Sequence, residues 1–170
     1  IIVFYMNWYD HMNDPAYTSE DLYPIGLFEA TGIELEYMIA DSETFDVLPI
    51  CDLILSEISG ELNNEVYPDG ADGFSAWSNE LALHVIEFKS LNPIRNLSEA
   101  GVAFQDQVSA VNKLLVRHNA QLLPTAMHPW MNPETEFRIW PHGHQEIYDS
   151  FVRIFRSTGP TLSPLPTLYL

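Results

Sequence analysis

The chain has 170 residues, a hydrophobic fraction of 46% and a formal charge of −17 at pH 7. This hydrophobic content is too high for a disordered chain and supports one domain with a buried core. Because the chain has only seven Lys and Arg residues, we expect neither a nucleic-acid partner nor an anionic membrane surface.

The cysteine content and the absence of a long apolar run indicate a cytoplasmic protein. Cys51 is the single cysteine, which excludes an internal disulfide. It lies in an apolar run, so we expect it in the core. No stretch approaches the ~20 apolar residues of a membrane span, and residues 1–6 lack the positive flank of a signal peptide. Homo-oligomerisation is left open.

The first half of the chain predicts a strand, a helix and a shorter strand after an irregular lead-in. Residues 1–27 show no clear periodicity. Residues 33–40 alternate as a strand, with Leu35, Tyr37 and Ile39 on one face and Glu34, Glu36 and Met38 on the other. A turn at 41–44 leads to a return strand at 45–48. Residues 49–59 predict a helix with Gly60 just past its end, and residues 61–67 a short strand.

The second half predicts a second clear strand and the longest helix. After a polar loop at 68–73, residues 81–89 read as a strand. Asn96 and Glu99 resemble a capping box at the start of a helix over 97–119, whose apolar stripe includes Leu97. A strand at 121–125, a loop at 131–143 and a helix at 144–155 follow. The Pro-rich tail, 156–170, is not expected to fold alone. The fold class is α+β.

Carboxylates inside these strands are the candidate functional residues. Glu34 and Glu36 share one strand face, and Glu87 and Lys89 share a face of the other strand. A charge in such a place is costly unless it is compensated, and the usual cation for an all-carboxylate site is Mg²⁺ or Mn²⁺. The alternative is an exposed strand face. Glu80 and Glu87 are seven residues apart, so on one regular strand their side chains would project from opposite faces. Both can serve one site only if Glu80 precedes the strand or a bulge intervenes.

A zinc hydrolase using histidines is a rival hypothesis. His128, His142 and His144 are nitrogen donors of the kind that bind Zn²⁺. However, no second Cys and no HExxH motif accompanies them, so hydrogen bonds to loop carbonyls are the simpler interpretation. The chain also lacks the glycine-rich phosphate loops GxGxxG and GxxxxGK[ST].

Three segments in order resemble the glutamate–cysteine ligase type 2 group, the carboxylate–amine ligases. They are Gly-Ile-Glu-Leu-Glu-Tyr-Met-Ile at 32–39, Trp-Ser-Asn-Glu-Leu-Ala-Leu-His-Val-Ile-Glu-Phe-Lys at 77–89 and Met-His-Pro-Trp-Met at 127–131. The resemblance runs over about 28–155. It implies part of a glutamine synthetase-like catalytic domain, with a mainly antiparallel curved sheet and helices packed on one face.

The resemblance also implies a function: ATP- and Mg²⁺-dependent (or Mn²⁺-dependent) amide-bond formation through an acyl phosphate. The expected substrates are glutamate or another carboxylate, and an amine such as cysteine. The implied catalytic and metal-binding residues are Glu34, Glu36 and Glu87, with Glu80 as a further metal and cofactor residue, Lys89 as a cofactor residue, and His128 and Trp130 as substrate residues.

The sequence lacks recognisable counterparts of the second half of this family. The family's later His-containing strand, further metal-binding acids and basic phosphate contacts are not recognisable after about Phe155. We therefore expect the chain to be the N-terminal portion of a ligase, inactive by itself. The alternative is a truncated or degenerate acidic α+β module that acts by binding a partner instead of by catalysis.

Overall fold

The computed structural model describes residues 28–70, 73–124, 128–143, 146–147 and 150. The expected lead-in at 1–27, the Pro-rich tail and most of the expected helix at 144–155 lie outside the described residues, and residues 146, 147 and 150 of that helix are helical. The elements in chain order are β1 (Glu34–Asp41), α1 (Cys51–Ser59), β2 (Glu65–Val66), β3 (Ser75–Asn79), β4 (Val85–Ser90), α2 (Leu97–Leu115), the 3₁₀ helix η2 (Val116–His118), β5 (Ala120–Leu123) and α3 (Pro133–Glu136).

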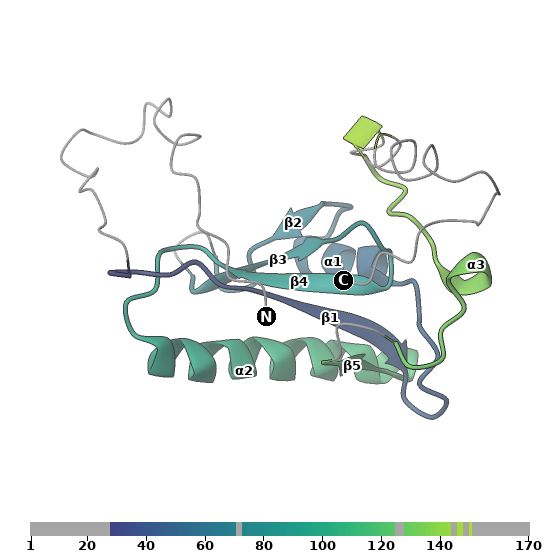
Figure 1. The fold of residues 1–170 in the computed structure, drawn as a ribbon, viewed down its shortest axis with the longest axis horizontal. Coiled ribbons are helices and arrows are strands. Elements are labelled where there is room, and N and C mark those ends of the chain that lie inside the picture. The colour runs from purple at the N-terminus through teal and green to yellow at the C-terminus, as the bar shows by residue number, and fades with distance from the viewer. Residues whose placement is uncertain (1–27, 71–72, 125–127, 144–145, 148–149, 151–170) are drawn as a thin grey trace.

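The strands form one five-stranded sheet in the order β2-β3-β4-β1-β5. Every neighbouring pair is antiparallel, which confirms the α+β class. Figure 1 shows α2 lying along β1, with α1 behind β3 and β4. Both helices pack on the same face of the sheet, where Ile39, Ile54, Phe88, Val111 and Leu115 belong to one core.

The face assignment predicted for β1 is confirmed. Leu35, Tyr37 and Ile39 pack with the helix-side core, whereas Met38 belongs to a smaller cluster on the opposite face. Cys51 is fully buried in the helix-side core, and burial raises the pKa of its thiol, as expected of an unreactive core residue. No helix in the described part of the chain is both long and apolar enough to cross a bilayer.

Two of the predicted strands are shorter in the structure, and one strand was missed. The expected strand at 81–89 begins only at Val85, because the preceding residues form a connection in which the Leu83 N–H donates to the Arg138 carbonyl at 2.8 Å. The strand expected at 61–67 is limited to Glu65–Val66. β3 was not predicted, since Ser75–Asn79 lacks the apolar alternation that signals a strand.

Other boundaries also needed correction. The return strand expected at 45–48 is a single bridge between Ala40 and Val47, and residues 131–143 contain the short helix α3. Asn96 is the N-cap, as predicted, since its side chain accepts from the Ser98 N–H. Glu99 accepts from the Asn96 side-chain amide at 2.7 Å, so the two residues interact through their side chains and not through the backbone bonds of a capping box. The helix ends at Leu115, not Asn119, because η2 tightens the last turn and Asn119 adopts a left-handed φ of 49°.

Candidate functional site

The face of the sheet opposite the helices carries the predicted carboxylates. Glu34 and Lys89 are register partners on β1 and β4, and so are Glu36 and Glu87. Residues directly opposite each other in an antiparallel pair project from the same face. The structure therefore brings together these four side chains, which the sequence placed on two separate strands.

One row of this face crosses four strands in register. Glu36 on β1 lies opposite Glu87 on β4, which lies opposite Ser78 on β3, which lies opposite Glu65 on β2. We call these three carboxylates and one serine the carboxylate row. Its centre is the buried Glu87, whose side chain accepts a hydrogen bond of 2.5 Å from the Ser78 hydroxyl. Glu87 also shares a side-chain hydrogen bond with Glu34. Neither contact supplies the positive charge that would compensate a buried carboxylate, so the row is suited to a cation.

The pKa values of the carboxylates next to Glu87 are raised. Burial is the main cause that raises the pKa of Glu36, and the charge of Glu87 adds to it. Burial also raises the pKa of Glu34, together with the charge of Glu87, whereas the nearby Lys89 opposes the shift. Acids that share a small region resist ionising together. A divalent cation among them would remove that repulsion.

Glu80 reaches the same cluster from outside the strands. It lies in the connection between β3 and β4. Glu80 therefore precedes the strand of Glu87, which is one of the two arrangements that allow both residues to serve one site. Burial, followed by the charges of Glu87 and Glu36, raises the pKa of Glu80 to about 7. Its Oε2 accepts one hydrogen bond of 3.1 Å from the Leu81 N–H. Glu80 is thus half-protonated near neutral pH in the absence of a cation.

Lys89 is engaged by an acid that the sequence analysis did not select. Its ammonium group forms an ion pair with Glu65 on β2. Glu65 stands within the short strand expected at 61–67, and only the register with Ser78 reveals that it faces the carboxylates. Both side chains of this pair are about one-third exposed, so their attraction is weak enough to be exchanged for another anion.

The chemistry of the donors fits a hard divalent cation, although the carboxylates do not form a closed cage. Carboxylate oxygens are the ligands that Mg²⁺ and Mn²⁺ prefer. Within the described ranges, no three His, Cys, Asp or Glu side chains are grouped so that they could hold a metal ion. Glu34, Glu36 and Glu87 on the sheet, and Glu80 in the connection before β4, thus offer oxygen donors near one another without being arranged as a metal site in this structure.

His128 and Trp130 lie in a loop that is fastened to the turn after β1. His128 Nε2 contacts the Phe45 carbonyl oxygen at 2.6 Å, and His128 Nδ1 accepts from the Met131 N–H at 3.0 Å. The Trp130 indole N–H donates to Asp46 at 3.2 Å. The same segment covers one end of the carboxylate face, where Met131 and Phe137 pack on the cluster that contains Met38 and Val85.

The histidines of the zinc hypothesis have separate partners in the structure. His142 Nε2 lies 2.8 Å from Asp52 Oδ2, whereas His128 is held at Phe45. His144 lies outside the described residues. The contacts of His128 agree with the simpler interpretation, hydrogen bonding to a loop carbonyl.

Comparisons with known proteins give a family and one relative. The family described as "Glutamate-cysteine ligase family 2(GCS2)" matches residues 30–161. An "Uncharacterized protein" of Archaeoglobus fulgidus is 36% identical over 124 residues, which is 73% of this chain and 32% of that protein. The chain thus spans about a third of the length of this relative. No solved structure matches.

Proposed function

Because the chain belongs to the glutamate–cysteine ligase family 2, we propose that its carboxylate face is the metal-binding part of an ATP-dependent carboxylate–amine ligase. The single observation that carries this proposal is the register of Glu36 opposite Glu87, with Glu34 and Glu80 beside them. The proposed substrates are small molecules, a carboxylate such as glutamate and an amine such as cysteine.

The proposed reaction explains why the site is rich in acids and needs no nucleophilic Ser or Cys. The carboxylate of one substrate takes the γ-phosphoryl group of ATP to give an acyl phosphate and ADP, and the amine then displaces phosphate and releases a proton. When bound, Mg²⁺ or Mn²⁺ would supply the positive charge that neutralises the charge developed in phosphoryl transfer. The oxygen ligands for it would come from Glu34, Glu36 and Glu87 on the sheet, a rigid scaffold, and from Glu80 in the connection before β4.

The remaining residues have positioning roles in this proposal. The Ser78 hydroxyl fixes the orientation of the Glu87 carboxylate through its 2.5 Å hydrogen bond. Lys89 is assigned to a phosphate of the nucleotide, and Glu65 holds its ammonium group on the carboxylate face until then. The loop that carries His128 and Trp130 borders this face through Met131 and Phe137, which makes it the candidate wall for the substrates.

A thermal melt with and without Mn²⁺ plus ATP tests the proposal. Ligands that bind only the folded chain stabilise it by ~2.7 kcal/mol at a hundred times their dissociation constant. We expect a metal-dependent rise in Tm for the parent chain and for Glu61→Gln, a control at an exposed acid away from the strands. We expect no rise for Glu87→Gln. A cooperative melt that ignores both ligands would instead favour the non-catalytic, partner-binding module.

A further inference from the structure

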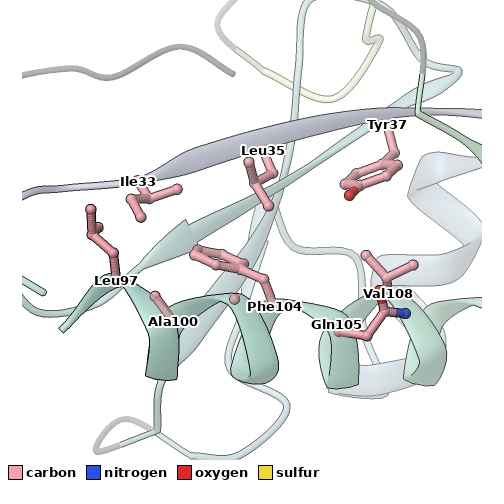
Figure 2. Close-up of a pocket in the computed structure, with 9 residues that line it drawn as sticks. Ile33, Leu35, Tyr37, Leu97, Ala100, Phe104, Gln105 and Val108 are labelled. Carbon is pink, nitrogen blue, oxygen red and sulfur yellow. The ribbon is translucent and has the colours of Figure 1, made fainter.

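An apolar groove lies between β1 and α2 on the helix side of the sheet. It has a volume of about 270 Å³. Figure 2 shows Ile33, Leu35 and Tyr37 on one side of it and Leu97 and Phe104 of α2 on the other. Leu97, which the sequence placed on the inner stripe of its helix, is 62% exposed. We call this surface the β1–α2 groove, and its apolar side chains are left partly uncovered.

The helix side of the β1–α2 groove is open at Gly101. This residue lines the groove, and a Cβ atom there would meet nothing within 4 Å. The next residue, Val102, is 66% exposed and does not line the groove. Because glycine carries no side chain, another segment can approach the backbone of α2 closely at this one position.

The described part of the chain begins at one end of the groove. Its first residue is Phe28, which is 83% exposed. Thr31 and Ile94 form a bridge with two backbone hydrogen bonds of 2.9 Å, shortly before Ile33 on one side of the groove and Leu97 on the other. Figure 1 shows the lead into β1 and the start of α2 at the same end of the molecule. The preceding part of the chain therefore joins the described structure at this end of the groove.

Residues 1–6, Ile-Ile-Val-Phe-Tyr-Met, have the composition that fits the groove. They form the longest unbroken apolar run outside the described residues and carry no charged side chain. By contrast, residues 7–27 contain four acids, which an acidic chain repels. The tail at 156–170 has three prolines and no apolar run longer than three residues. Among these segments, residues 1–6 gain most from burial against apolar side chains.

The lengths of the groove and of this segment also match. On α2 the groove extends from Leu97 to Val108, which is about 17 Å at the rise of ~1.5 Å per helical residue. Six extended residues cover about 20 Å at ~3.3 Å per residue. The residues between Met6 and Phe28 can span up to about 70 Å, so the connection allows residues 1–6 to reach every part of the groove.

We propose that residues 1–6 of this chain pack in the β1–α2 groove and cover its apolar side chains. Leu35 and Tyr37 alternate with Glu34 and Glu36 on β1, so the contact supports from the helix side the strand that presents two acids on the opposite face. It requires neither a cation nor ATP and is independent of the proposed ligase activity. The alternative occupant, a second copy, would bring together two chains with a formal charge of −17 each, which is unfavourable.

Disulfide trapping in the full 170-residue chain tests this contact. Val3→Cys or Phe4→Cys is combined with Gly101→Cys, because neighbouring residues of an extended segment point to opposite sides and one of the two should face α2. The matched control combines the same changes with Val102→Cys, outside the groove. Cys51 is fully buried and does not compete. For one of the two segment positions, we expect an intramolecular disulfide with position 101 to form about tenfold faster than with position 102, or faster still.

Non-reducing gel electrophoresis and peptide mass mapping identify the product in dilute protein under mild oxidation. The proposal is overturned if trapping is equally fast at positions 101 and 102, or if neither segment position is trapped at position 101. It is also overturned if position 101 gives disulfide-linked dimers in place of the intramolecular bond, which would identify a second copy as the occupant.

A thermodynamic cycle measures whether the contact stabilises the folded chain. Val3→Asp together with Phe4→Asp places two charges in an apolar groove, so the equilibrium constant for unfolding in urea should rise by about tenfold or more. Gly101→Trp fills the groove, and in this background the same double change should alter the constant less than about twofold. In the Val102→Trp background the full effect should remain. An equal effect in both Trp backgrounds would show that residues 1–6 do not occupy the groove.

Discussion

Replacing Glu80 with Gln should stabilise the protein at alkaline pH in the absence of metal. The pKa of Glu80 is raised to about 7 from an ordinary 4.5, mainly by burial and then by the charges of Glu87 and Glu36. This difference corresponds to about 3 kcal/mol of unfavourable free energy when Glu80 is ionised. Gln removes the charge and keeps an oxygen that accepts from the Leu81 N–H, a bond of 3.1 Å.

The sign of the pH dependence follows from the raised pKa. Because the folded state holds the proton more tightly than the unfolded state, the contribution of Glu80 to stability is fully present below pH 4.5 and is lost as the pH rises through about 7. Urea unfolding at pH 8 should show Glu80→Gln to be more stable than the parent chain by about 3 kcal/mol, and at pH 4.5 the two should agree. The exposed Glu61→Gln serves as the control. Equal stability of Glu80→Gln and the parent chain at pH 8 would refute the reasoning that burial, together with the neighbouring acids, makes the ionised form of Glu80 unfavourable.

Three further predictions concern burial on the two faces of the sheet. Burial, with the nearby His128, lowers the pKa of His84 to about 4, so stability should fall as the pH drops from 6.5 towards 4, and His84→Leu in the Glu80→Gln background should flatten this loss in acid-unfolding curves. Ser78→Ala should cost about 2 kcal/mol in urea unfolding because it removes the hydroxyl donor of the buried Glu87; an unchanged midpoint would show that the bond is dispensable. Phe88→Ala should cost ~3–5 kcal/mol in the same assay, because Phe88 is fully buried in the core, and a loss below 1 kcal/mol would contradict that packing.

The sequence was sufficient to predict the parts of the fold that follow from residue alternation. Strict alternation over 33–40 predicted both the strand and its faces, and the structure confirms Leu35 and Tyr37 on the helix side. The missed strand β3 is the counter-example. Trp77 is its main apolar residue, between the polar Ser75 and Asn79, and its register with β4 depends on contacts made elsewhere in the sheet. Tertiary pairing decided its structure, not local pattern.

The candidate site also contains residues that the sequence could predict and residues that it could not. Their position inside apolar strands and the resemblance to the family selected Glu34, Glu36 and Glu87, and residue alternation placed Glu34 with Glu36, and Glu87 with Lys89, on common strand faces. Residue alternation could not decide the position of Glu80, because a connection has no fixed period, and its proximity to the carboxylates is visible only in the perturbed pKa of its side chain. Glu65 was missed for a similar reason, because two residues of β2 give too short a pattern to assign a face.

Direct counting of bound Mn²⁺ by electron paramagnetic resonance tests the central claim that the carboxylate face binds a divalent cation. We predict saturable binding by the 170-residue chain and by Glu61→Gln, and at least tenfold weaker binding by the Glu36→Gln and Glu87→Gln double variant, since removal of two oxygen ligands leaves the cation poorly held. Equal binding by the double variant and the parent chain, or no binding by the parent chain, would contradict the claim.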